Sequence, residues 1–371
     1  MTVSEQSQLV PLLEELSGAV EELLLAGLTA ASKATVERLD VSFKEASRRK
    51  LLRLGSTLRI ANEEIVKFTS GSPQFSARRF NFFLSRAWLL ATAMQHAIRN
   101  QDQAALDRLL FTPVAQPVAS LRFVVLGVAK RIVPGAFASF DFRLRAVGDC
   151  APVRDGDPLV WSCVFPIRRE LDLPAEAFLH LPQKQGFKPA VLLERRHATA
   201  TKCAISVPTG GAARLLLSDA SKVELGESVG DWSVYRHWDR AASAQRLDAY
   251  LPTPLDLEIE FQEEVCLETW TAGECSETSE GYDLLTIESE GLQLSARLEA
   301  GPSGVPLRGV VKKLAELESE ERPPLYGLAH YEQCRLVFQP LSAWGVNGIE
   351  YLTLIGDKIS QAEIVKAMKF T

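Results

Sequence analysis

The chain has 371 residues, of which 46% are hydrophobic and 24% are charged, a composition typical of an ordinary globular protein. This composition excludes global disorder, and a prior of about 150 residues per domain predicts two or three domains. The net charge of −6 is unevenly distributed. Residues 42–108 carry 12 Lys and Arg against 5 Asp and Glu, whereas residues 255–299 carry 13 acidic residues and a single basic one. We therefore expect one basic and one strongly acidic region.

The first third of the chain predicts helices. Apolar residues recur at steps of three and four between Leu9 and Leu24, which is typical of an amphipathic helix. The same spacing runs from Ser76 to Asn100, and further apolar residues lie on its other faces. We expect this second segment to be a central helix, with Trp88 buried among its neighbours.

Between these two segments the sequence predicts shorter helices. Ser42 and Glu45 have the spacing of a capping box, which predicts that a helix starts there and runs to about Phe68. Gly55 lies inside that segment, where it predicts a kink or a break. A short last helix is expected from Asp102 to Leu110.

Two prolines, Pro113 and Pro117, mark a change of pattern because they cannot continue a helix. After them, apolar and polar residues alternate, as in the segment 139–147, which predicts half-buried antiparallel strands joined as a meander. The predicted fold class is therefore α+β. An all-helical bundle is predicted over residues 1–112. A larger, mostly antiparallel β-rich region is predicted over 118–371, either as one domain or as two subdomains divided near 231–254.

The rest of the β-rich region is predicted from shorter patterns. A few helices are expected among the strands, over 175–181, 241–250, 307–317 and 361–369. Further strands are predicted near Cys203, Leu215, Ile259, Leu285, Leu294, Leu336 and Tyr351.

No common catalytic signature is present in the sequence: the phosphate-binding loop, the G-x-S-x-G elbow, the H-E-x-x-H helix and the G-x-G-x-x-G turn are all missing. The five histidines are widely separated, and none has a second ligand at metal-binding spacing. We therefore expect no catalytic residue, no metal and no cofactor. Six scattered cysteines and a start without a secretory signal predict free thiols in the cytoplasm, and no segment predicts a membrane span.

One dense cluster of aromatic and polar residues occurs between Asp231 and Arg240. Its aromatic side chains supply flat surfaces and its polar ones supply charge, a mixture typical of binding hot spots. The alternative is a strand or loop that packs its aromatics on a sheet, and this reading is favoured. The candidate binding residues are Trp232, Tyr235, Arg236, His237, Trp238 and Asp239.

The charge asymmetry predicts a second candidate surface. Acidic side chains on a strand near Ile259 would share one face, opposite either the basic helices of the same chain or a basic partner. The alternative, weighted equally, is that this acidic face is exposed to solvent and has no partner. The residues of this charge-directed interface are Glu258, Glu260 and Glu263 on the acidic side and Arg48, Arg49 and Arg53 on the basic side.

From these observations we expect a cytoplasmic, non-enzymatic protein that acts in protein interaction, as a scaffold or accessory protein. The expected partner is another protein. Nucleic acid is not favoured as a partner, no membrane is expected, and no small molecule is identified. One alternative is an enzyme or small-ligand binder with its site around Trp232 to Arg240. Another is nucleic-acid binding through the basic helices.

Overall fold

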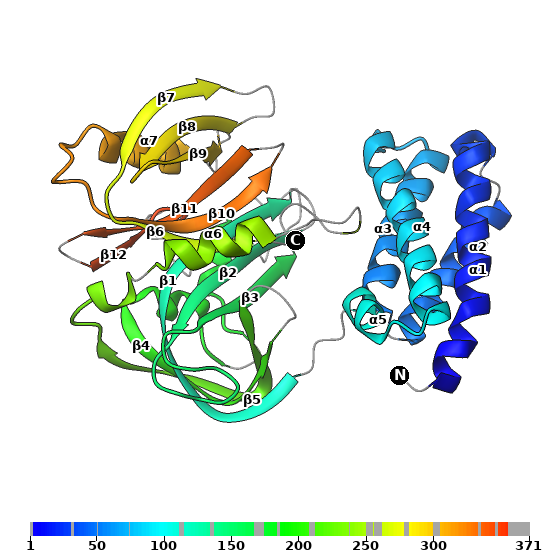
Figure 1. Cartoon of the computed structure of the whole chain (residues 1–371), viewed down its shortest axis with the longest axis horizontal. Coiled ribbons are helices and arrows are strands. Elements are labelled where there is room, and N and C mark those ends of the chain that lie inside the picture. The colour runs from blue at the N-terminus through cyan, green and yellow to red at the C-terminus, as the bar shows by residue number, and fades with distance from the viewer. Residues whose placement is uncertain are drawn as a thin grey trace. The chain divides into compact units, whose positions relative to one another are not determined.

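The structure is a computed structural model that describes residues 3–354, except 31–32, 50, 74, 111–114, 134–136, 167–173, 184–185, 208–211, 237, 250–254, 256–261, 278–281, 300–304, 333–334 and 346–347. The chain forms two compact units, Met1–Pro113 with Leu251–Leu257, and Val114–Tyr250 with Glu258–Thr371. The first is helical and the second is mostly β-sheet (Figure 1), which confirms the α+β class. The independent folding of the region before residue 112 stays a prediction. Within the described part of the chain, no helix has the length and apolar character needed to cross a bilayer.

The helical unit is organised around α4, which contacts α1, α3 and α5. The bounds are α1 Val3–Ala26, η1 Leu28–Ala30, α2 Lys33–Arg48, α3 Leu52–Thr69, α4 Ala77–Arg99 and α5 Gln103–Leu110. The apolar stripe of α4, including Phe80, Leu84 and Met94, is buried as its spacing predicts. Trp88 corrects the prediction: it is only partly buried, and its Nε1 donates a hydrogen bond of 2.6 Å to Glu21 Oε1. The polar edge of the indole therefore stays at the surface of the bundle.

The break between α2 and α3 lies later in the chain than the capping box at Ser42 predicts. α2 runs straight through Ser42 and Glu45, and the chain turns between Arg48 and Leu52. Gly55 lies inside α3, where an added Cβ would come within 3.1 Å of Ser47 Oγ. This glycine therefore permits close contact between two antiparallel helices and does not end one.

The second unit begins with a closed barrel of five strands. Their bounds are β1 Ala115–Val133, β2 Phe137–Ala146, β3 Pro158–Pro166, β4 Arg196–Ser206 and β5 Ala213–Ser228. The order around the barrel is β1-β2-β3-β5-β4, with β3 and β5 parallel and all other pairs antiparallel. Two short 3-10 helices, η2 Ala175–His180 and η3 Pro189–Leu193, connect β3 to β4 and bury Phe178, Leu179 and Leu192 in the core. This ring order is that of the OB fold.

A second sheet repeats the order. Its bounds are β6 Glu263–Leu267, β7 Thr271–Glu277, β8 Tyr282–Ser289, β9 Leu292–Glu299, β10 Leu325–Glu332, β11 Arg335–Gly345 and β12 Gly348–Tyr351, with α7 Val305–Ala315 between β9 and β10. The sheet order is β6-β10-β11-β9-β8-β7. Only three residues separate β6 from β7, so the two act as one strand bent at Glu268–Trp270. With that bent strand first, the ring follows the order of the first barrel, including one parallel pair, β9 with β11. Leu307 and Val311 of α7 lie in its core.

The two barrels share an apolar interface within this unit. Val124 and Leu126 point outward from β1 and lie in one buried cluster with Tyr326, Leu341 and Trp344 of the second barrel. The register of β1 against β2 shifts between Val125 and Gly127, which marks a β-bulge there. An added Cβ on Gly127 would come within 2.8 Å of Leu341 Cβ, so only glycine fits this close approach.

Main-chain carbonyls at and next to the bulge accept hydrogen bonds from the second barrel. Ser342 Oγ donates to Leu126 O at 2.5 Å, and Tyr351 Oη donates to Val125 O at 3.2 Å. Thr353 Oγ1 donates to Val128 O at 2.5 Å. The register of β1 with β4 ends at Phe123, so these three carbonyls lie beyond that pairing and accept from the second barrel instead.

The same interface holds a buried charge pair. Arg145 Nη2 of β2 lies 3.0 Å from Glu264 Oε2 of β6, and Arg143 Nη2 donates to Gln262 Oε1 at 2.7 Å. Burial disfavours the Arg145 charge, but Glu264 more than compensates, so the pKa of Arg145 is raised. Burial, with the Glu264 charge nearby, also raises the pKa of Tyr326, which therefore stays neutral. The barrels are joined by apolar contacts, hydrogen bonds and an ion pair together.

Candidate functional site

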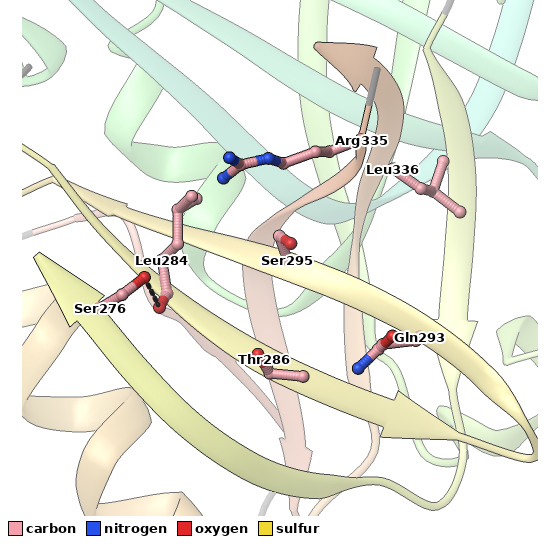
Figure 2. Close-up of a pocket in the computed structure, with 7 residues that line it drawn as sticks. All are labelled: Ser276, Leu284, Thr286, Gln293, Ser295, Arg335 and Leu336. Carbon is pink, nitrogen blue, oxygen red and sulfur yellow. Dashed lines mark hydrogen bonds between the residues drawn. The ribbon is translucent and has the colours of Figure 1, made fainter. Parts of the chain in front are cut away.

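An open groove of about 400 Å³ lies on the outer face of the second barrel. Its lining residues come from β7, β8, β9 and β11 (Figure 2). The lining residues are Ser276, Leu284, Thr286, Gln293, Ser295, Arg335 and Leu336. Residues of β8 and β9 that face each other in the register supply the floor, with Thr286 opposite Ser295.

The groove offers several free hydrogen-bonding groups. Ser276 Oγ donates to Leu284 O at 3.4 Å. Within the described part of the chain, the side chains of Thr286, Gln293 and Ser295 have no hydrogen-bond partner. Leu284 adds an apolar surface beside Ser276 (Figure 2), and Leu336 lines the groove while packing against the core of the barrel. A ligand here would meet hydroxyl and amide groups together with short apolar surfaces.

Arg335 is the cation of the groove. It is exposed and extends its guanidinium group over the groove (Figure 2). The neighbouring Arg297 is engaged elsewhere: its guanidinium lies 4.2 Å from the Tyr282 ring centroid and 3.0 Å from Glu332. Among the residues that the structure describes, Arg335 forms no ion pair. Its charge is therefore available to a ligand.

The first barrel carries a different surface. Residues 115–230 contain 15 Lys and Arg against 11 Asp and Glu, whereas residues 231–371 contain 12 against 24. Six cations of the first barrel are exposed and form no ion pair with any acid in the described ranges. They are Arg122, Arg131, Arg154, Lys202, Arg214 and Lys222.

Three of these cations lie on the two neighbouring strands β4 and β5. Lys222 of β5 is one strand away from Lys202, since it pairs with Thr201 in the register. Lys202 sits at an irregularity of β4 with a positive φ of 52°. Arg214, near the start of β5, pairs with Ser206.

The basic helices predicted from the sequence are largely neutralised within the helical unit. Arg48 Nη2 lies 2.9 Å from Glu45 Oε2, and Arg49 Nε lies 3.8 Å from the same oxygen. Arg53 Nη1 donates to the main-chain oxygen of Arg108 at 3.3 Å. Exposed helical pairs of this kind are the usual state of a solvated helix face.

The acidic side of the predicted interface is only partly described. Glu258 and Glu260 lie outside the described residues. Glu263 is buried at the start of β6, where its carboxylate accepts from Ser243 Oγ at 2.7 Å and pairs with Arg246. Both partners belong to α6 Arg240–Ala249 of the same chain. An interface formed by these acids and the basic helices stays a prediction.

The aromatic cluster forms the connection between the two barrels. Trp232 is buried in the shared interface, with its ring centroid 6.4 Å from that of Trp344. Trp238 Nε1 donates to Ser243 Oγ at 2.7 Å, and Asp239 Oδ1 accepts from the Ala242 amide at the start of α6.

The remaining members of this cluster are less enclosed. Tyr235 is partly buried beside the shared interface, and Arg236 Nη1 lies 3.7 Å from Glu268 Oε2. His237 lies outside the described residues. A binding role for this cluster stays a prediction.

No protein-family model matches the chain, and no curated protein matches it. Solved structures give matches of low similarity. A crystal structure of the Ifi202 HINa domain in complex with 20-bp double-stranded DNA matches with a TM-score of 0.29 and 8% identity, over 61% of this chain and 94% of that one. A murine DNA-binding protein bound to double-stranded DNA matches with a TM-score of 0.25 and 11% identity, over 65% and 100%. The p202 HIN1 domain in complex with a 12-mer duplex matches with a TM-score of 0.26 and 6% identity, over 62% and 92%.

These matches correct the partner prediction. The sequence predicted another protein as partner and did not favour nucleic acid, whereas all three of these structures are described as DNA complexes. We withdraw the protein partner. TM-scores below 0.3 do not identify the ligand of this chain, so the proposed function rests on the chain's own residues.

Proposed function

We propose that this protein binds nucleic acid without catalysis, through contacts between the outer surface of its first barrel and the phosphate backbone. The observation that carries the proposal is the set of exposed cations on that barrel without an acidic partner among the described residues. An unpaired surface cation releases condensed counterions from a phosphate without first breaking an ion pair. Arg48, Arg59 and Lys67 of the basic helices pair with glutamates instead, so the first barrel supports the proposal better than the helices do.

The fold supports the same class of ligand. Five-stranded barrels of this topology bind oligonucleotides and oligosaccharides on their outer strands, although topology by itself does not specify a ligand. Outward residues in the middle of β2 and β3 are Ser139, Asp141, Ser162 and Val164, none of which is aromatic. Binding of single strands usually relies on stacking of bases on aromatic rings. We therefore propose recognition of the backbone, independent of base sequence.

We also place the protein in the cytoplasm as part of this proposal. All five described cysteines are free thiols. Burial raises the pKa of Cys163 and of Cys266 to about 12, so both thiols stay protonated and unreactive. Free buried thiols are typical of proteins in a reducing compartment.

The test is fluorescence anisotropy with a labelled duplex of random sequence, titrated with the full chain at several salt concentrations. The barrel variant combines Lys202→Gln, Arg214→Gln and Lys222→Gln. We expect weaker binding and a shallower plot of log K against log salt, by about 0.9 for each phosphate that the variant no longer neutralises.

A matched variant of the basic helices provides the control. Arg38→Gln combined with Arg48→Gln and Arg59→Gln removes three exposed cations of α2 and α3 that pair with glutamates, the same change of charge as in the barrel variant. We expect this variant to bind the duplex as the unmodified chain does. If the helix variant loses affinity while the barrel variant keeps it, the contact surface lies on the helices and the proposal is wrong. No salt-sensitive binding by the unmodified chain would also overturn it.

A further inference from the structure

The groove of the second barrel does not belong to the proposed nucleic-acid surface. It lies on the half of the chain where acidic residues outnumber basic ones by 24 to 12. Exposed carboxylates, including Glu274, Glu277 and Glu288, lie on β7 and β8 beside it. Such a surface repels a polyanion at short range. Its ligand must therefore carry little negative charge.

We propose that this groove binds a small ligand with one carboxylate and several hydroxyl groups, the chemistry of a sugar acid. Arg335 supplies the charge complement, since its planar guanidinium matches a carboxylate with two parallel hydrogen bonds. One carboxylate satisfies Arg335, the one cation among the described residues that line the groove. A second negative group would face the surrounding glutamates.

The floor of the groove matches the hydroxyl groups. The hydroxyls of Thr286 and Ser295 both donate and accept, and the Gln293 amide does the same. Thr286 of β8 lies opposite Ser295 of β9, and Gln293 lies two residues before Ser295 on the same strand, so they present several partners and not a single point. Leu284, whose side chain lies on the same side as the Arg335 guanidinium (Figure 2), supplies an apolar contact for the carbon-bearing face of a sugar ring. A volume of about 400 Å³ is within the range of small-molecule sites.

The test uses three probes with the full chain: glucuronate, glucose and acetate. Glucuronate carries both features, glucose only the hydroxyls and acetate only the carboxylate. We expect saturable binding of glucuronate in ligand-observed NMR, and affinities at least about tenfold weaker for the other two, equal to about 1.4 kcal/mol. No saturable binding of glucuronate, or equal affinity for all three, would overturn the proposal.

Three variants connect the binding to the groove. Arg335→Gln should weaken glucuronate binding to the level of glucose binding. Arg335→Lys should retain part of the glucuronate affinity, because the positive charge remains but the paired donors of the planar guanidinium are lost. Thr286→Val should weaken both glucuronate and glucose, since it removes a hydroxyl and keeps a side chain of similar size. Lys313→Gln, an exposed cation of α7 outside the groove lining, is the control with the same charge change and should bind normally. If Lys313→Gln lost as much glucuronate affinity as Arg335→Gln, net charge alone would explain the binding and the proposal would be wrong.

A competition experiment separates this proposal from the proposed function. An unlabelled duplex should not displace glucuronate, because the two surfaces lie on different barrels. Displacement would place the groove within the nucleic-acid surface and overturn the separate ligand. Loss of duplex binding in the first-barrel variant with intact glucuronate binding would support both proposals independently.

Discussion

The two barrels have the same strand order but opposite surfaces. The first carries an excess of basic residues and exposed cations without acidic partners in the described ranges, whereas the second is strongly acidic and has a groove lined by hydroxyl groups. The ring order is fixed by core residues that point inward, and it leaves the outward positions free to differ. The comparison shows that a single strand order in one chain can carry two kinds of surface. The ligand of each barrel therefore has to be inferred from its outward side chains and not from its topology.

The largest expected effect is a loss of stability at the contact between the two barrels. Glu264→Ala removes the acidic partner of Arg145 and leaves two buried arginines without it, which typically costs about 3 to 5 kcal/mol. We expect the single unfolding transition of the unmodified β-rich unit, followed by calorimetry, to shift to lower temperature or to split into two. Glu350→Ala, at an exposed position of β12, is the control and should change little. An unchanged transition in Glu264→Ala would mean that the barrels do not depend on this ion pair.

The next effect concerns the close approach of the barrels. Gly127→Ala forces a Cβ against Leu341, and overpacking of this kind typically costs about 1 to 3 kcal/mol. Chemical denaturation of the full chain measures the change. Gly226→Ala in β5 is the matched control, since its added Cβ would meet ordinary contact distances of 3.5 Å or more. Equal stability of the two variants would show that β1 and β11 can move apart at no cost.

The smallest effect tests the charge difference itself. Glu224→Gln with Glu227→Gln neutralises two exposed acids on β5 of the first barrel, and Glu274→Gln with Glu277→Gln does so on β7 of the second. We expect the first pair to raise duplex affinity by about twofold at low salt, consistent with the modest worth of exposed charges. The second pair should have a smaller effect because screening weakens distant charges. A larger effect from the β7 pair would place the nucleic acid on the second barrel.

Local patterns predicted the elements with regular periodicity. The α4 stripe and the alternation in β2 both follow from side chains that face a single core. Two strands gave no such pattern. β7 is exposed along nearly its whole length, and β10 is buried on both faces for six consecutive residues. Neither alternates, so the sequence did not predict them.

Closure of the barrels and formation of the groove depend on distant pairings. The first barrel closes through a short parallel contact in which Leu159 pairs with Ala213, and no local signal indicates such a pair. The groove combines residues from four strands, and its serines and threonine look like ordinary surface residues in the sequence. The capping box at Ser42 failed for a related reason, because its spacing also fits the middle of a longer helix.

The hydrogen bonds at the β1 bulge bear on how this chain tolerates change. The second barrel contacts main-chain oxygens of Val125, Leu126 and Val128, so these bonds do not depend on which side chains those positions carry. Substitutions there are limited by packing alone. An insertion or deletion of one residue in β1 is different: it would reverse which face each side chain occupies and displace all three acceptors together. Length variation in this protein should therefore be confined to its loops and excluded from β1.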